Sequence, residues 1–202
     1  MSKPISASLV PGSALAAAPQ TRTSLWLRSA GLALAGSALV AVCAHLALPL
    51  YFTPVPLSLA PFAVLVIGLV LSPRLAAATL GAYLLEGALG LPVFSPTPAI
   101  PGVAHLLGPT GGYLLSYPLA AALIAFLVRR TSRGFVPAFL SAALGSFVIL
   151  AGGALWLAAL THASLPSVFT LAVLPFLPGD ALKVAAAAGL AAGWVRLRRP
   201  TT

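Results

Sequence analysis

The fold of this chain is decided by residues 136–160, which read VPAFLSAALGSFVILAGGALWLAAL and contain no charged side chain. A helix needs roughly 20 apolar residues to cross about 30 Å of hydrocarbon, and this stretch is long enough. Backbone polar groups in lipid must be satisfied within the segment, which favours a helix over irregular chain. The stretch therefore predicts a membrane-spanning helix, and other parts of the chain are similarly apolar.

The composition of the whole chain agrees with a membrane protein. Of its 202 residues, 60% are hydrophobic and only 6% are charged, whereas soluble domains carry about a quarter charged residues. The net charge of +9 does not indicate nucleic-acid binding, because the basic residues lie in clusters between apolar runs rather than on one polar face. A single cysteine, Cys43, excludes an intramolecular disulfide.

Six apolar spans can be placed along the sequence, and they predict an all-α polytopic membrane protein with six transmembrane helices. We expect a disordered N-terminal tail over residues 1–24, a membrane domain over residues 25–196 and a short C-terminal tail over residues 197–202. The predicted spans are Leu25–Leu48, Leu57–Ser72, Arg74–Leu91, Gly111–Val128, Val136–Leu160 and Gly179–Val195.

The basic residues occur on only one side of these spans. They precede the first span, lie between the second and third and between the fourth and fifth, and follow the sixth. The other connections, about residues 49–56, 92–109 and 162–178, contain no Lys or Arg. Under the positive-inside rule, both termini face the cytoplasm and these three connections face outward. The sequence thus predicts a multi-pass protein of a cytoplasmic membrane.

The outward connections also hold most of the prolines of the chain. Proline fixes φ and restricts the preceding residue, so these segments are expected to be ordered and non-helical. They are apolar as well, with Phe94, Leu106 and Phe169 among their side chains. Two interpretations remain open from composition alone: the connections cover a cavity, or they only pack on the helix ends.

The chain has two carboxylates, Glu86 and Asp180, and both fall inside predicted spans together with Lys183. A charge at the bilayer centre costs about 2.5–3.5 kcal/mol on insertion scales, so such residues usually mark a site or pathway. Glu86 lies twelve residues (86 − 74) after Arg74, or about 18 Å along a helix. Asp180 and Lys183 lie in the first turns of a span that starts outside. All three are expected at one depth, where they would bind a polar small molecule.

Helical spacing adds neighbours to these charged residues. Asp180 and Lys183 are three residues apart and share a helix face, as do Tyr83 and Glu86. Tyr113 follows two glycines at the start of the fourth span. The alternative is structural: Asp180 caps its helix and pairs with Lys183, while Glu86 makes a contact between helices.

A stripe of small residues lies on the first span at Ala33, Ser37 and Ala41. Such spacing allows close contact between helices, either within the chain or with a partner. The three histidines match no metal-binding spacing, and no nucleophile–base pair is evident. We therefore expect no metal, no cofactor and no catalytic residue.

Four segments of the sequence resemble the BioY family, the biotin-specific membrane subunits of energy-coupling-factor (ECF) vitamin transporters. The resemblance covers about Leu25 to Trp194. The chain departs from the family pattern between Ser58 and Pro61 and between Ser95 and Pro101. The segments that carry the resemblance are Thr53-Pro54-Val55-Pro56, Tyr83 to Phe94 (YLLEGALGLPVF), Leu107 to Tyr113 (LGPTGGY) and Pro175 to Lys183 (PFLPGDALK).

This resemblance implies a six-helix substrate-binding (S) component of the bacterial inner membrane, without enzymatic activity. Such a subunit binds biotin on its outer face, and it works with a membrane coupling protein and two ATP-binding subunits. The chain itself has no Walker motif. The stripe Ala33, Ser37 and Ala41 resembles the Ala-xxx-Ala surface that meets the coupling protein. The expected ligand-binding residues are Asp180, Lys183, Glu86, Tyr83 and Tyr113.

Two other functions remain as alternatives at this stage. An S component for another small vitamin would keep the fold and change the site. A stand-alone secondary transporter would use Glu86 and Asp180 for protons or ions, and it would move its substrate without ATP-binding subunits.

Overall fold

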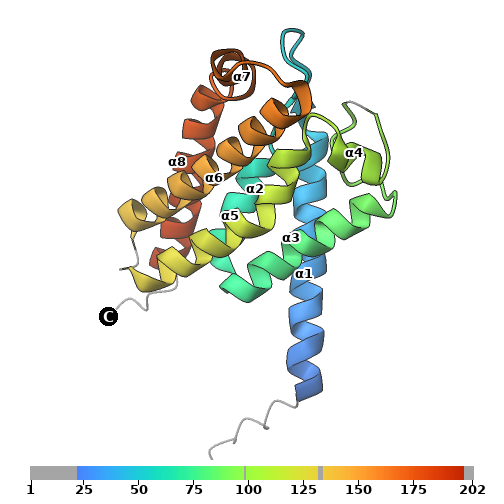
Figure 1. Cartoon of the computed structure of the whole chain (residues 1–202). Coiled ribbons are helices and arrows are strands. Elements are labelled where there is room, and N and C mark those ends of the chain that lie inside the picture. Colours follow the sequence, from blue (N-terminus) through green and yellow to red (C-terminus); the bar gives the residue numbers. More distant parts are fainter. Residues whose placement is uncertain (1–21, 98, 132–133, 198–202) are drawn as a thin grey trace, which may run out of the picture.

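The computed structural model describes residues 22–97, 99–131 and 134–197. These residues form an up-and-down bundle of helices with one short antiparallel ribbon (Figure 1). The predicted tails lie outside the described residues, except for residues 22–24 and 197, which are helical. The elements are α1 Arg22–His45, β1 Ala47–Leu48, β2 Leu57–Ser58, α2 Ala60–Val70, α3 Pro73–Ala88, α4 Val103–Leu107, α5 Gly111–Arg130, α6 Phe135–Thr161, α7 Leu165–Ala172 and α8 Leu177–Leu197.

Each of the six predicted spans contains a helix, but several ends were misplaced by two or three residues, including the end of the third span, where α3 stops at Ala88 and not at Leu91. The first span was predicted to end at Leu48 and the second to start at Leu57. In the structure, Ala47 pairs with Ser58 and Leu48 with Leu57, so the backbone at both ends is used for strand pairing. Helix α2 then starts at Ala60, where Pro61 occupies the first turn and its fixed φ suits a helix start.

Three helices are long and apolar enough to cross a membrane: α1 over Thr23–His45, α5 and α6. A fourth crossing results if α7 and α8, which meet at a bend of 51°, count as one broken span. Helix α2 has 11 residues and α3 has 16, so they reach only about 16 and 24 Å. A helical membrane protein is therefore confirmed, while the count of six crossings stays a prediction.

The two ends of the bundle differ in character. The loop end carries the long connections, residues 46–59, 89–110 and 162–176, together with α4 and α7 (Figure 1). The basic end is where α2, α5 and α8 finish and where α1, α3 and α6 begin. Six arginines of the described residues mark the basic end: Arg22, Arg28, Arg74, Arg129, Arg130 and Arg196.

Helix α5 lies at the centre of the packing, in contact with α2, α3, α4 and α6. The core around it is apolar and fully buried, with Val64 and Leu80 at 0% exposure and Ile149 at 2%. Helix α1 behaves differently in its first turns, where Trp26 is 75% exposed and the helix stands clear of the others (Figure 1). The bundle is thus tightest near the loop end.

Candidate functional site

A cavity of about 60 Å³ lies inside the loop end of the bundle. Its wall is formed by α1, α2, α3, α5, α6 and α8 and by all three long connections. Most of the lining is apolar, and the polar groups come from a few side chains. The polar and aromatic residues of the lining are Ser58, Tyr83, Ser95, His105, Thr110, Tyr113, Tyr117, Phe176, Asp180 and Lys183.

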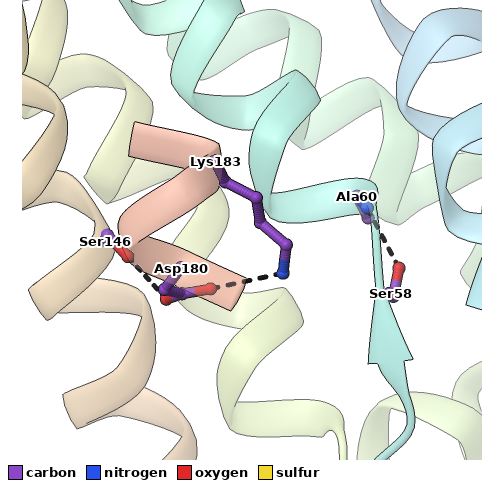
Figure 2. A network of polar contacts seen from close by, with 5 residues as sticks. All are labelled: Ser58, Ala60, Ser146, Asp180 and Lys183. Carbon is purple, nitrogen blue, oxygen red and sulfur yellow. Dashed lines mark hydrogen bonds and ion pairs between the residues drawn. The ribbon is translucent and has the colours of Figure 1, made fainter. Parts of the chain in front are cut away.

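The charged part of the cavity is a group of three side chains on α6 and α8. Lys183 Nζ lies 3.2 Å from Asp180 Oδ1, and the two residues are 9% and 7% exposed. Ser146 Oγ donates a hydrogen bond of 2.6 Å to Asp180 Oδ2. Figure 2 shows Lys183 extending from α8 toward the start of α2, with the carboxylate held between the serine and the ammonium group. Both oxygens of Asp180 therefore have partners.

The position of Asp180 follows from the start of α8. The helix begins at Leu177, two residues before the predicted Gly179, and Asp180 N already donates to Phe176 O at 2.8 Å. A carboxylate in the first turn is favoured by the positive end of the helix dipole. Spacing of three residues then places Lys183 on the same face of the helix. The sequence of this turn thus brings the two charges of the ion pair together, while Ser146 of α6 supplies a further partner for Asp180.

Three tyrosines form the opposite wall of the cavity. Tyr83 on α3 and Tyr117 on α5 stack with ring centroids 6.5 Å apart. Tyr113, one turn before Tyr117, donates its hydroxyl hydrogen to Ala172 O and packs beside Phe176 at 6.1 Å. A Cβ at residue 153 of α6 would overlap the Tyr113 ring, so only glycine leaves room for it there. The tyrosines bring flat apolar surface and hydroxyl groups to the same place.

The second long connection folds onto α3 through Phe94. Its ring lies edge-on to Tyr83, with centroids 5.4 Å apart, and stacks on His105 at 5.0 Å. A Cβ at Gly87 would overlap the Phe94 ring, so the glycine permits the contact. His105 is 3% exposed, and its Nδ1 lies 3.0 Å from Ile100 O. Burial lowers the pKa of His105, and the hydrogen bond to Ile100 opposes this only in part.

The loops over the cavity are also tied to one another by hydrogen bonds. Thr53 Oγ1 donates to Leu171 O at 2.8 Å, which joins the first connection to α7. Trp156 Nε1 donates to Gly108 O at 2.9 Å, which fixes the second connection to α6. Of the two interpretations left open by composition, the first is confirmed, because residues of all three connections line the cavity.

Four of the five predicted ligand-binding residues come together here, and the fifth does not. Asp180, Lys183, Tyr83 and Tyr113 all line the cavity. Glu86 lies almost one turn beyond Tyr83 on α3, outside this lining, and accepts a hydrogen bond from Ser37 of α1. The structure thus uses Glu86 for a contact between two helices, while its part in ligand binding stays a prediction.

The stripe of small residues on α1 turns partly inward. Ser37 is 1% exposed, and Ala33 and Ala41 are half-buried. The stripe therefore packs against α3 at its central residue. Its contact with a partner protein stays a prediction.

Sequence reasoning missed several members of the site. Ser146 looked like any other small residue of an apolar helix. The only sign that it belongs to the site was its hydroxyl group in the middle of a predicted span. Tyr117 carried a clearer one, since it lies four residues after Tyr113 and so on the same helix face. His105 was considered only as a metal ligand, and its spacing from the other histidines spoke against that role. Its contacts with Phe94 and Ile100, which hold the loop, cannot be seen in residue spacing.

With this geometry described, comparison with known proteins gives a family. The model of the family described as "BioY family" matches residues 16–200 of the chain. The chain belongs to the BioY family. Membership fits a cavity under the loops at one end of a helical bundle, and it confirms the resemblance drawn from the four sequence segments.

Relatives in the BioY family carry names that agree with one another. A protein of Pyrococcus horikoshii named "Probable biotin transporter BioY" is 42% identical over 134 residues, covering 66% of this chain and 76% of the relative. "Biotin transporter BioY2" of Lactococcus lactis is 34% identical over 148 residues, covering 73% and 79%. "Biotin transporter BioY" of Thermotoga maritima is 33% identical over 155 residues, covering 77% and 88%.

A solved structure shares the fold. The S-component for biotin from an ECF-type ABC transporter superposes with a TM-score of 0.78, over 88% of this chain and 95% of that chain. The sequence identity in this comparison is 24%, so it bears on the fold alone. The S-component fold implied by the sequence resemblance is confirmed in outline.

Proposed function

We propose that this chain is the biotin-capturing membrane subunit of an ECF-type vitamin importer, and that it binds biotin in the cavity at the loop end. The observation that carries the proposal is the buried Lys183–Asp180 pair, which lies in an otherwise apolar cavity of a BioY-family protein. A buried ion pair is a costly way to stabilise a helix start, and a hydrophobic pair would usually do as well. Binding of a ligand with complementary polar groups would explain why this ion pair is present.

The chemistry of biotin matches both the charged pair and the apolar lining of the cavity. Its ureido ring offers two N–H donors and a carbonyl acceptor, its fused rings are apolar, and its chain ends in a carboxylate. Asp180 can accept N–H groups in charge-assisted hydrogen bonds, and Lys183 can donate to a carbonyl or neutralise the acid. Tyr83, Tyr113 and Tyr117 supply flat surface for the apolar rings. The polar contacts fix orientation, and the apolar walls supply most of the binding energy.

The loops must move for biotin to enter. The cavity measures about 60 Å³, whereas ligand pockets usually measure about 300–1,000 Å³. The most economical change is a displacement of the segment around Phe94 and His105, which contributes side chains to the wall but is not part of a long helix. Since prolines stiffen these connections, we propose that they move as units.

We further propose six crossings, with both termini in the cytoplasm of a bacterial cell and the loop end outside. The arginines of the described residues gather at the basic end, as the positive-inside rule requires of cytoplasmic connections. The short helices α2 and α3 would then span only part of the bilayer thickness, and neighbouring parts of the bundle would occupy the rest. Reporter fusions at Thr131 should give a cytoplasmic signal and fusions at Ser95 an external one. A cytoplasmic signal at Ser95 would refute this topology.

Energy for import would come from partners: a membrane coupling protein and two ATP-binding subunits. Because Ser37 is turned toward α3, we propose that the coupling protein contacts the exposed side of α1 next to it, at Gly31, Ala35 and Ala38. Ala35→Trp should abolish uptake in cells and leave biotin binding in detergent unchanged. Loss of both activities would mean that this side of α1 supports the fold.

The experiment that tests the main proposal is direct. The purified full chain is titrated with biotin, and then with thiamine and riboflavin as other vitamins, by isothermal calorimetry. Biotin is expected to bind at one site per chain and the other vitamins to give no heat. Tight binding of another vitamin in place of biotin would refute the ligand and leave the S-component role standing. Uptake that depends on a proton gradient, without ATP-binding subunits, would favour the secondary transporter instead.

A further inference from the structure

A second cavity lies at the basic end of the bundle, far from the first. It measures about 500 Å³ and is enclosed by the ends of α2, α5 and α8 and the start of α6. Residue 194 of α8 lines it, whereas Asp180 of the first cavity lies fourteen residues (194 − 180) earlier in the same helix. This separation is about 21 Å along the axis. The two cavities are therefore independent.

Most side chains that line this second cavity are apolar, but polar groups at the helix ends and one arginine also contribute to its surface. Leu69 and Val128 face it from α2 and α5, and Ala192 and Val195 from α8. Arg129, which is exposed, contributes the positive charge. Arg130 and Arg196 follow directly on lining residues of the same two helices but do not line the cavity themselves, so Arg129 is the charged residue of its described lining.

No acidic side chain opposes this charge nearby. The chain has two acidic residues, Glu86 and Asp180, and neither lines the cavity. Asp180 is held by Lys183 and Ser146 at the other end of α8. A distance of about 21 Å exceeds the Debye length of about 8 Å at physiological ionic strength, so the aspartate does not neutralise the arginine.

The rim of the cavity suits the surface of a bilayer. Trp194 is 53% exposed and Val70 is 54% exposed, so the mouth presents an aromatic ring and aliphatic surface outward. Tryptophan is favoured where hydrocarbon meets headgroups. Gly134 begins α6 at this cavity, and the first turn of α6 contains no acidic residue. The positive end of that helix dipole therefore adds to the charge of Arg129.

We propose that this cavity binds one anionic phospholipid, with its phosphate beside Arg129 and its acyl chains along the apolar walls. Charge complementarity selects the anionic headgroup, and the open, aliphatic rim selects a lipid over a soluble anion. Basic pockets between helix ends are a recurrent solution for holding acidic lipids. Lipid binding here requires only membrane insertion, so it does not depend on biotin being the transported ligand.

The test is native mass spectrometry of the full chain in a mild detergent. Phosphatidylglycerol and phosphatidylcholine with the same acyl chains are each titrated into the wild type, into Arg129→Gln, and into Arg74→Gln as a matched control. Arg74 is also exposed at the basic end but does not line the cavity. One arginine near a lipid surface is worth about a five-fold change in affinity. The wild type and Arg74→Gln should prefer phosphatidylglycerol, and Arg129→Gln should lose about five-fold of that preference.

Two further arms keep the proposal falsifiable. Ala192→Trp fills the cavity from α8 and should reduce binding of the first lipid molecule of either kind, with the variant still monodisperse on size exclusion. Glycerol phosphate at the same molar ratio should not displace phosphatidylglycerol. Displacement would identify a small soluble anion as the occupant and overturn the proposal. Equal binding of the two lipids to the wild type, or an equal loss in both arginine variants, would overturn it as well.

Discussion

The two side-chain carboxylates of this chain, Asp180 and Glu86, differ in burial and in partners: Asp180 is buried, whereas Glu86 is half-buried. Each accepts a hydrogen bond from a serine on a neighbouring helix, Ser146 for Asp180 and Ser37 for Glu86. Asp180 also lies 3.2 Å from a lysine and lines the loop-end cavity. Within the described residues, Glu86 has no ion-pair partner and does not line that cavity. The helix face on which an acidic residue lies decides which groups it meets.

Of the substitutions that test this comparison, Lys183→Met is expected to reduce the affinity for biotin most. It leaves Asp180 buried without its cation, and breaking a buried pair costs about 3–5 kcal/mol. At about 1.4 kcal/mol per decade, the affinity for biotin should fall by at least about 100-fold. Equilibrium dialysis with labelled biotin measures it. The double variant Asp180→Asn/Lys183→Met should recover thermal stability and not affinity; recovery of both would show that the pair serves the fold alone.

Asp180→Asn and Glu86→Gln compare the two carboxylates directly. The amide that replaces the carboxylate of Asp180 is a poorer acceptor for an N–H group, so affinity should weaken by roughly 10- to 100-fold. Glu86→Gln should change affinity by no more than about two-fold, since Glu86 lies outside the cavity lining. The affinities of the two variants for biotin are measured by calorimetry on monodisperse preparations. A loss in Glu86→Gln as large as in Asp180→Asn would restore Glu86 to the ligand site.

The serine donors give a finer version of the same comparison. Ser146→Ala removes a hydrogen bond of 2.6 Å from Asp180 and should weaken biotin binding by about five-fold. Ser37→Ala should leave affinity unchanged and lower the melting temperature by about 3 °C, because its bond joins α1 to α3. Both quantities are measured on the same preparations. Reversed effects would exchange the roles assigned to the two sites.

The smallest expected effect concerns His105, whose pKa is lowered by burial. The packed loop favours the neutral imidazole, so the loop loses stability as pH falls below about 6.5, the value of a free histidine. Since biotin binds only when this segment is displaced, affinity for biotin should rise about two-fold between about pH 7.5 and about pH 5.5. His105→Gln should flatten this dependence. A wild-type affinity that is constant over this range would remove His105 from the loop closure.

Much of this architecture could be predicted from the sequence. Apolar runs predicted the helices α1, α2, α3, α5, α6 and α8, and the near-absence of charge in these runs made Asp180 and Lys183 conspicuous. Tyr113 and Tyr83 were found from helical spacing and family resemblance. What failed was local: the ribbon of Ala47–Leu48 and Leu57–Ser58 shortened two spans, because strand pairing across a proline-rich turn leaves no trace in hydropathy.

The site could be predicted only where spacing along one helix decides contact. Asp180 and Lys183 meet because they lie one turn apart, whereas Glu86 and Ser37 meet because α1 and α3 are adjacent. Ser146 reaches Asp180 across two helices, 34 residues apart in sequence. Such pairs depend on helix rotation, which an almost uniformly apolar sequence specifies weakly.

The volume of the loop-end cavity, about 60 Å³, has a consequence for binding kinetics. A ligand too large for the closed form binds only to the fraction of molecules that is open, and the observed dissociation constant is raised by the inverse of that fraction. The association rate should then level off at high ligand concentration, at the rate of loop opening. Release must pass through the same opening, so a captured vitamin would stay bound long enough for a slower partner to act.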